Sequence, residues 1–541
     1  MAALLLLGPG VLLQALLARE RRAVELPLLA AAFWVVAFWW LRLLPWGWTV
    51  PVTVVGVVSL CAGAFLFRRV PDAGSALVWC AAAAVTVVLA RSALVAPGID
   101  AAAHAAVARI LVESHGHPQG FRPLWPLDEL RGYPFGQPTL AALLAGFARL
   151  DWRAAACWGP ALAHGMAVVA FASAVSRYRG TALGLAAGVV AVLAARAPLH
   201  FWTWGGAPNA LGIAFGVAAF AAGLDAVRNG DGRNAIACAL YLAAGLLAHP
   251  TTVVAFGYCA LVLVGATLAL RRIPLRGAGA LAAAALIASV LCAPYFVTVR
   301  PIDPRGAAWI RAWLHESATL AVLPRMLHDV PLLAGGAALV AVAVRARRRA
   351  ALPAALAALL VLLVLHGRAA VLPASLVLYP DRIAVLLLYP IALLAHDALE
   401  SRPRLLAAGI ACLVLVHAGI LQRKLLRDGA AHALATEADL RLLSSARLPE
   451  GCWVINNYGD AGQWIPALLG RPITFPHIHV AFFGLEQRVH PCAAFRGEKR
   501  PYHVDTVTCP GPGCDLVARE GRAELFRIVD PALTVELSAQ R

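Results

Sequence analysis

Charge is scarce in this sequence. Charged residues make up 14% of its 541 positions, hydrophobic residues make up 61%, and the mean hydropathy is +0.74. This balance excludes both a soluble globular protein and a disordered one. Lysine is almost absent and arginine replaces it, a bias typical of a GC-rich bacterial genome. The formal charge of +17 comes from short arginine clusters between apolar runs, so it indicates membrane orientation and excludes nucleic-acid binding.

Long apolar segments fill most of the first 427 residues. A helix of roughly 17–23 residues crosses a bilayer. We identify about fourteen such spans, near 2–18, 24–42, 51–67, 75–96, 155–175, 181–197, 208–226, 235–248, 252–270, 277–297, 330–344, 350–366, 383–399 and 404–420. The first span has no small-residue cleavage site after it, so we interpret it as an anchor helix. The sequence therefore predicts an all-α, multi-pass membrane bundle over residues 1–427.

Arginine clusters fall in every second loop, which places those loops in the cytoplasm. They are Arg19/Arg21/Arg22, Arg68/Arg69, Arg177/Arg179, Arg228/Arg233, Arg271/Arg272/Arg276, Arg345/Arg347/Arg348/Arg349 and Arg402/Arg404. The alternate loops then face outward, and they include 97–138, 198–207, 297–329 and 367–382. The tail after the last span is expected on the outer side as well.

The tail differs in composition from the rest of the chain. Residues 428–541 hold 11 basic and 13 acidic residues, a net charge of −2. The run CWVIN (452–456) is typical of a strand, and GDAGQWIPALLG (459–470) of a turn followed by a short helix that ends at Gly470. We expect residues 428–541 to form a small extracytoplasmic α/β domain.

Four of the eleven cysteines lie in this tail, and the other seven lie in apolar spans as small packing residues. An oxidising compartment favours one or two disulfides in the tail, with Cys492 paired to Cys509 or Cys514 and with Cys452 as the fourth candidate. Alternatively, CPGPGC forms half of a zinc site with His490 or His503. The spacing of ordinary zinc sites is missing, which favours the disulfides.

The loop 97–138 places a carboxylate and an imidazole at the membrane surface. Asp100 and His104 are four positions apart, one helical turn, in APGIDAAAHAAVARI (96–110). A long outward loop that carries both polar and aromatic residues indicates a functional role for the loop. In the structural interpretation, Asp100 is the N-cap of a helix over 101–112 and His104 is an ordinary interfacial histidine. In the functional interpretation, both residues take part in catalysis.

The motifs in this loop carry a resemblance. Asp100-x-x-x-His104, a Trp-Pro element and GYPFGQPTL (132–140) resemble the GT-C class of polytopic glycosyltransferases, and most closely uncharacterised bacterial membrane proteins of that class. The tail segment VINNYGDAGQWIPALLGRPITFPH (454–477) is similar to one that those proteins carry after their last span. One departure is that three spans precede the one that leads to Asp100.

The resemblance implies sugar transfer from a polyprenyl-phosphate donor to a lipid or glycan acceptor at the outer face of the bacterial inner membrane. Asp100 is then the candidate base for the acceptor hydroxyl. The leaving phosphate needs cations, for which Arg131, Arg305 and Arg382 are candidates. A divalent ion, Mg²⁺ or Mn²⁺, could bridge Asp100 and His104, although two ligands do not define a metal site.

Other outward residues are candidate contacts for sugar or lipid. They are Asp128, Glu129, Arg131, Tyr133, His200, Trp202, Trp204, Arg305, Asp381 and Arg382. Each has a structural alternative: tryptophans anchor spans at the interface, and Asp381 and Arg382 can neutralise each other.

Two other classes of function remain open. A flippase or other transporter for lipid-linked glycans would place ionisable groups at mid-span, whereas here they concentrate at loop mouths. A non-catalytic scaffold would use the tail to bind cell-envelope partners. Replacement of Asp100 by Asn tests these alternatives, because only a transferase that uses Asp100 should lose its effect on glycan composition while the protein stays folded and inserted.

Overall fold

The computed structural model describes residues 2–17, 23–66, 72–122, 124, 129–130, 134–179, 182–194, 198–269, 275–300, 404–475, 487–499 and 513–537. Eleven of the predicted spans lie on described helices, whereas those near 330–344, 350–366 and 383–399 lie outside the described residues. The helices are α1 (Ala2–Leu17), α2 (Leu26–Leu41), α3 (Thr49–Leu66), α4 (Ala73–Arg91), α5 (Ile99–Glu113), α6 (Gly136–Gly146), α7 (Trp152–Arg179), α8 (Ala182–Ala194), α9 (Ala207–Asn229), α10 (Gly232–Ala248), α11 (Pro250–Ala269), α12 (Leu275–Thr298) and α19 (Arg404–Ala431).

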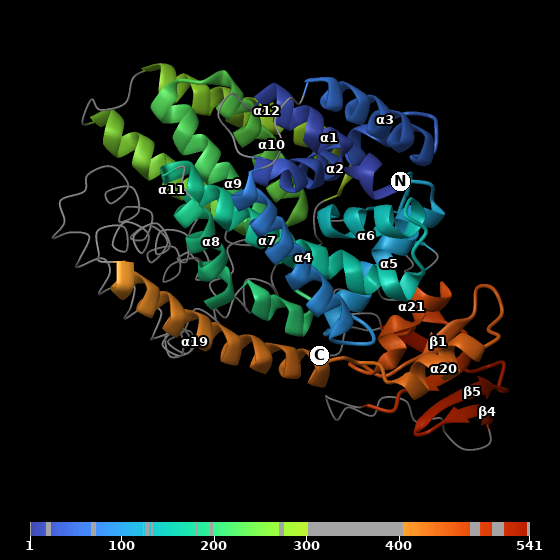
Figure 1. Ribbon diagram of the computed structural model, residues 1–541. Helices are drawn as coiled ribbons and strands as arrows, with labels where there is room; N and C mark the ends of the chain where they lie inside the picture. Colours follow the sequence, from blue (N-terminus) through green and yellow to red (C-terminus); the bar gives the residue numbers. More distant parts are fainter. Residues whose placement is uncertain are drawn as a thin grey trace.

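The helices form one bundle in which α9 is central (Figure 1). It packs against α7, α10 and α11, and its residues from Ala207 to Gly223 are all buried. Helices at the rim differ, because α3 exposes Phe65 (78%) and α12 exposes Val297 (85%). Several exposed apolar side chains at the rim of a helical bundle are typical of a lipid-facing surface. Six of the described helices are long and apolar enough to cross a bilayer, and the chain is a multi-pass membrane protein.

A small mixed sheet follows the bundle. The strands are β1 (Trp453–Ile455), β2 (Gln487–Val489), β3 (Pro491–Arg496), β4 (Cys514–Glu520), β5 (Ala523–Ile528) and β6 (Val535–Leu537). Four of them form a sheet in the order β1-β3-β5-β4, in which β1 is parallel to β3 and the other pairs are antiparallel, while β2 and β6 form a separate antiparallel pair. The expected architecture, a helical bundle with a small C-terminal α/β part, is confirmed.

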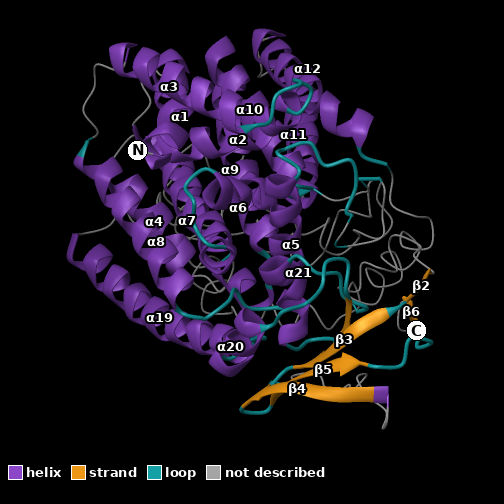
Figure 2. Cartoon of the chain, turned by 90° about the vertical axis from the view of Figure 1, so that its right-hand side faces the viewer, coloured by secondary structure: helices purple, strands orange, loops and turns teal. Residues whose placement is uncertain are grey.

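The short helices of this C-terminal part link the sheet to the bundle. They are α20 (Glu437–Ser445), the 3-10 helix η5 (Ala461–Trp464) and α21 (Ile465–Leu469). Both η5 and α21 pack on α5, and Figure 2 shows α21 directly beside α5, between the bundle and the strands. The sheet therefore sits at the end of the bundle where the expected outward loop begins.

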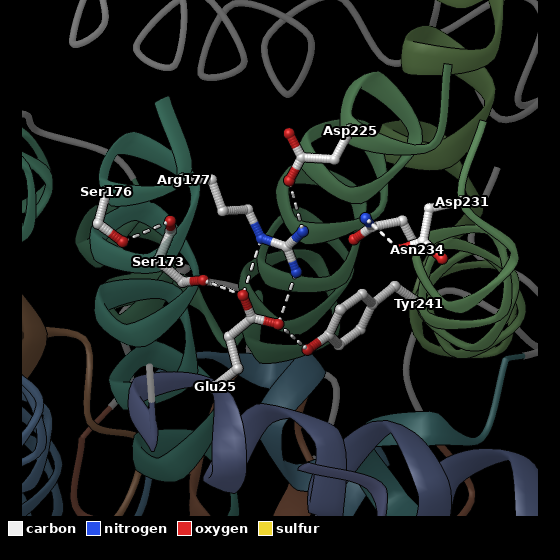
Figure 3. A network of polar contacts seen from close by, with 8 residues as sticks. All are labelled: Glu25, Ser173, Ser176, Arg177, Asp225, Asp231, Asn234 and Tyr241. Atoms are coloured by element: carbon white, nitrogen blue, oxygen red, sulfur yellow. Dashed lines mark hydrogen bonds and ion pairs between the residues drawn. The ribbon is translucent and has the colours of Figure 1, made fainter. Parts of the chain in front are cut away.

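Arg177, a member of one of the arginine clusters, is buried in a network of ion pairs. Its side chain is 7% exposed and forms ion pairs with Glu25 at 2.7 Å and with Asp225 at 3.0 Å. Ser173 and Tyr241 also donate to the Glu25 carboxylate, at 2.6 and 3.2 Å (Figure 3). The network joins the start of α2 to α7, α9 and α10. A cation can be buried here because two carboxylates compensate for its desolvation.

Candidate functional site

The N-cap of α5 is Gly98, not Asp100. Gly98 is the N-cap with φ of +85°, and Asp100 lies in the first turn. A Cβ on Gly98 would lie only 2.1–2.5 Å from backbone atoms of Trp204. The expectation that Asp100 caps this helix was therefore wrong, because close backbone packing requires glycine at the cap and shifts the start of the helix. The Asp100 carboxylate remains in the turn where the helix dipole favours negative charge.

A second glycine brings the aromatic turn against Asp100. The 3-10 helix η2 (Leu199–Trp204) ends at Gly205, which has φ of +90°. A Cβ on Gly205 would lie 2.4 Å from the amide nitrogen of Ala101 and 3.0 Å from Cβ of Asp100. Helix α9 starts two residues later, at Ala207. The turn that leads into α9 therefore packs against the first turn of α5, which brings the positive ends of the two helix dipoles near each other.

The end of α19 closes the same corner. The amide of Gly98 donates to the carbonyl of His432 at 3.1 Å, just after α19 ends. Gly429 lies against Trp202 and Pro97, since a Cβ there would come within 3.6 Å of both. Two segments separated by more than 300 residues in the sequence therefore meet at the start of α5.

Aromatic residues of η2 divide into buried and accessible members. Trp202 is 2% exposed, and its ring meets that of His164 edge to face at 6.0 Å between centroids. Trp204 is only partly buried. Of the two tryptophans, Trp204 is the more accessible and its backbone lies against Gly98 at the start of α5, whereas Trp202 serves as packing. His200 accompanies them and lies near the Thr203 hydroxyl, at 3.3 Å.

His164 was not identified from the sequence. It is completely buried on α7, and its Nδ1 lies 2.8 Å from the carbonyl of Pro160, one turn earlier. A proton on Nδ1 satisfies that contact and makes Nε2 an acceptor, for which the described residues supply no donor. The available signal was a lone histidine in an otherwise apolar span, and such residues in membranes are often functional.

Three further buried polar atoms beneath this corner lack a partner among the described residues. They are Gln137 Oε1, Trp202 Nε1 and Asn209 Oδ1. Gln137 and Asn209 lie in the first turns of α6 and α9, and α6 packs against both α7 and α9. Unsatisfied buried polar groups are rare in proteins and indicate a place for water or ligand.

Comparison with solved structures identifies the fold. ArnT from Cupriavidus metallidurans bound to undecaprenyl phosphate matches 84% of this chain and 97% of its own, with a TM-score of 0.52 and 17% identity. ArnT in the apo state matches 85% of this chain and 99% of its own, with a TM-score of 0.53. The archaeal oligosaccharyltransferase AglB from Archaeoglobus fulgidus matches 73% of this chain and 64% of its own, with a TM-score of 0.44 and 13% identity. No protein-family profile and no curated protein matches the sequence.

This chain has the GT-C fold. The likeness to ArnT extends over nearly all of that protein, which confirms the resemblance carried by the short motifs. Within the GT-C fold of this chain, Asp100 and His104 both lie on α5, one turn apart, with Asp100 partly exposed and His104 buried. The structure therefore brings together Asp100, His104, Trp204 and the end of α19.

Several predicted site residues lie outside the described residues. They are Asp128, Arg131, Tyr133, Arg305, Asp381 and Arg382. Glu129 is described, and its carboxylate lies 4.0 Å from the guanidinium of Arg300, with both side chains more than half exposed. A surface pair of this kind contributes little to stability.

The described residues do not form a metal centre. Nowhere within the described ranges do three His, Cys, Asp or Glu side chains gather closely enough to hold an ion. Asp100 and His104 provide two of the ligands that a divalent ion would need, whereas Mg²⁺ prefers six.

The tail contains disulfides, but the pairing that we expected was wrong. Cys492 is bonded to Cys452, with Cα atoms 5.5 Å apart, and not to Cys509 or Cys514. The parallel pairing of β1 with β3 places the two cysteines next to each other, a contact that spacing alone does not reveal. Cys514 is also disulfide-bonded, which leaves it unavailable for the alternative zinc site. Cys509 lies outside the described residues.

A buried carboxylate stands where the tail meets α5. Asp460, the N-cap of η5, is completely buried and accepts hydrogen bonds from the amides of Gly462 at 2.7 Å and Gly497 at 2.8 Å. Burial raises the pKa of Asp460 to about 7, although these hydrogen bonds oppose the shift. The charge on this residue therefore changes near neutral pH.

Proposed function

We propose that this protein is a membrane glycosyltransferase that moves a sugar from a polyprenyl-phosphate donor to a cell-envelope glycan or lipid acceptor. The observation that carries the proposal is the position of Asp100, which lies in the first turn of α5 against Gly205, the residue that ends η2 just before α9 begins. ArnT, which has the same fold, has been crystallised bound to undecaprenyl phosphate. A lipid phosphate at this corner would meet the positive ends of two helix dipoles.

The reaction requires a base and a way to stabilise the departing phosphate. Asp100 takes the proton from the acceptor hydroxyl, and the freed oxygen forms a bond to the anomeric carbon of the sugar. The bond from that carbon to the phosphate oxygen breaks, and its electron pair leaves with the lipid phosphate. Helix N-termini stabilise the added charge, with Arg131, Arg305 and Arg382 as the proposed cations.

The remaining site residues have proposed roles in orientation. His104 lies one turn from Asp100 on α5 and is buried, which suits a residue that holds the base or its proton network in place. Trp204 provides an aromatic face for a sugar ring beside the carboxylate. Residues Asp128, Glu129, Tyr133, His200 and Asp381 are the further proposed contacts, whereas the buried Trp202 packs against His164.

The proposed orientation places this site on the outer side of the bacterial inner membrane. Arginine alternation places residue 230 in the cytoplasm and the 97–138 loop with the tail outside. Single cysteines introduced at Gly230 and at Glu450 in a variant without other free cysteines would test it. A membrane-impermeant thiol reagent on intact spheroplasts should label only position 450, and labelling of position 230 alone would reverse the topology.

The decisive experiment compares Asp100→Asn with Asp151→Asn in cells that lack the wild-type gene. Asp151 caps α7 by accepting from the amide of Ala154 at 2.8 Å, so its variant is a matched carboxylate-to-amide control. Removal of a general base slows a reaction by about 10²–10⁴-fold. Asp100→Asn should therefore abolish the protein-dependent change in envelope glycans at unchanged protein levels, while Asp151→Asn retains it. Full activity of Asp100→Asn would refute the proposed role.

The same strains separate a transferase from a flippase or scaffold. A transferase produces a new covalent glycan on the acceptor, whereas a flippase changes only the side on which the lipid-linked sugar is found. Mass spectrometry of purified acceptors distinguishes the two results. If the protein is a scaffold, Asp100→Asn should change neither the glycan on the acceptor nor the side on which the lipid-linked sugar is found.

A further inference from the structure

The turn that follows β3, residues 497–499, is fixed by two carboxylates of the tail. Asp460 accepts a hydrogen bond from the amide of Gly497 at 2.8 Å, and Asp439 accepts one from the amide of Glu498 at 2.8 Å. Both acidic residues are completely buried, Asp460 as the N-cap of η5 and Asp439 in the first turn of α20. The backbone of the turn therefore has a defined position in the tail.

Lys499, the last residue of this turn, reaches from the tail to the end of α19. Its Nζ donates to the carbonyl of Ala430 at 3.4 Å and to that of Ala433 at 3.3 Å. Carbonyls at the end of a helix lack partners within the helix, and a cation stabilises them. Lysine occurs at only two of the 541 positions, 424 and 499. An ammonium group has three protons and no fixed plane, so it serves two carbonyls better than the rigid fork of arginine does.

The same end of α19 holds the N-cap of α5. The carbonyl of His432, which lies between Ala430 and Ala433 in the sequence, accepts from the amide of Gly98 at 3.1 Å. Asp100 follows Gly98 by two residues, in the first turn of α5. A continuous series of contacts therefore joins the sheet of the tail, through Lys499 and the end of α19, to the turn that carries Asp100.

We propose that Lys499 is a positioning residue for glycosyl transfer, because it holds the end of α19 and thereby keeps the N-cap of α5 and Asp100 in place. This inference rests on the proposed function, in which Asp100 is the base. A shift of about 1 Å in the position of a reacting group can slow a reaction by about 100-fold, so a contact outside the site can control the rate. Helix α21 packs on α5 separately, so loss of the Lys499 contacts should not release the tail.

Hydrogen exchange of the purified full-length protein measures this link directly. In Lys499→Met, the peptide that contains Gly98 should exchange about tenfold faster, because the hydrogen bond to His432 loses its support. The strands β3 and β5 and helix α21 should exchange at the wild-type rate. Lys424→Met, which removes the other lysine from an exposed position on α19, is the matched control and should leave Gly98 unchanged.

Restoration of the ammonium group provides a second measurement. Lys499→Cys alkylated with 2-bromoethylamine carries an ammonium at nearly the original distance from the backbone, so slow exchange at Gly98 should return. Wild-type protein treated in the same way controls for alkylation of the other thiols. Lys499→Arg keeps the charge without the compact ammonium and should restore slow exchange only in part.

Envelope glycans in cells that lack the wild-type gene provide the functional measurement. At unchanged protein level, the protein-dependent glycan should form about ten- to a hundredfold more slowly in Lys499→Met. Lys499→Arg should recover part of this rate, and Lys424→Met should match the wild type. Lys499→Arg gives the same comparison if Lys499→Met fails to fold.

The possible failures are distinct. Faster exchange throughout the tail of Lys499→Met would show that Lys499 only stabilises the tail, and would overturn the inference. Wild-type exchange at Gly98, or a wild-type rate of glycan formation where Asp100→Asn has none, would overturn it as well and leave the proposed function intact. Retained glycan formation in Asp100→Asn would instead refute the proposed function, and with it the role of Lys499.

Discussion

Arg109 donates from its guanidinium to the carbonyl of Ala467 at 3.0 Å, across 358 positions of sequence. Arg109 lies on α5, and Ala467 lies on α21 of the tail. Gly470, which ends α21 with φ of +66°, packs against the same guanidinium, 2.8 Å from the position of its missing Cβ. The pair holds the tail to the helix that carries Asp100 and His104.

We expect Arg109→Ala to loosen this junction. The lost hydrogen bond involves a charged donor and contributes about 1.5–3 kcal/mol, so amide exchange in α21 should accelerate by about ten- to a hundredfold. Hydrogen exchange with mass spectrometry on the full chain provides the measurement. Arg441→Ala removes an exposed arginine that pairs with Glu437 and should leave α21 unchanged. If α21 exchanges at the wild-type rate in Arg109→Ala, other contacts hold the tail.

Gly205→Ala should disrupt the corner around Asp100. The new Cβ would lie 2.4 Å from the amide nitrogen of Ala101, and φ of +90° is itself unfavourable for alanine. The clash must move η2 or α5, so transfer activity should fall together with folded yield in size-exclusion chromatography. Gly232→Ala is the control, since nothing lies within 4 Å of its added Cβ. Wild-type behaviour of Gly205→Ala would contradict the described packing.

Arg177→Met should strongly destabilise the bundle. It leaves the buried Glu25 carboxylate and Asp225 without their cation, a change that costs about 3–5 kcal/mol in buried pairs. The double variant with Glu25→Gln should recover part of this loss, because the buried charge on Glu25 is removed as well. The fraction of protein that remains monodisperse after heating in detergent measures both effects, with the exposed Arg233→Met as control. A double variant no better than Arg177→Met would show that the two residues are not coupled.

The stability of the tail should decrease as pH rises toward neutrality. The pKa of Asp460 is about 7 in the folded protein and close to 3.8 when unfolded, so the folded state binds more protons between these values. The free energy of unfolding then falls through this window by up to about 1.4 kcal/mol per pH unit, and levels off above it. Burial also raises the pKa of Asp439, which adds to the same trend.

Exchange of the Gly462 and Gly497 amides, followed from pH 5 to 8 and corrected for intrinsic rates, tests this dependence. The asparagine in Asp460→Asn cannot ionise, so this variant should lose most of the pH dependence and keep only the part due to Asp439. Asp515→Asn, at an exposed position on β4, should retain the full dependence. An unchanged slope in Asp460→Asn would assign the effect to other groups.

Reduction of the Cys452–Cys492 bond should destabilise the tail by about 4 kcal/mol, because the bond closes a loop with a sequence separation of 40 residues. Cys492→Ser should lower the thermal unfolding temperature of the tail without reductant. Reductant, which also breaks the bond of Cys514, should lower it further in this variant but by less than in the wild type. Non-reducing peptide mapping would show the pairing directly. A peptide that joins Cys492 to Cys514 would contradict it.

The sequence alone determined what depends on local composition. Apolar runs long enough to cross a bilayer gave the helices, because a lipid-embedded backbone must satisfy its own hydrogen bonds. The strand in CWVIN was predicted from its run of apolar residues, and the short helix before Gly470 from the turn residues on either side of it. Asp100 and His104 one turn apart on a helix were predicted for this reason too.

Only the tertiary structure decided the features that join distant segments. Asp100 lies inside the first turn of α5 because the N-cap is Gly98. Only glycine leaves room at that position for the backbone of Trp204, which follows more than a hundred residues later. Arg177 is buried because Glu25, at the start of α2, and Asp225, on α9, form ion pairs with it, whereas the sequence shows only that it belongs to an arginine cluster. Cys492 joins Cys452 because two strands pair in parallel. In each case the decisive partner is set by packing between elements, and spacing along the chain carries no information about it.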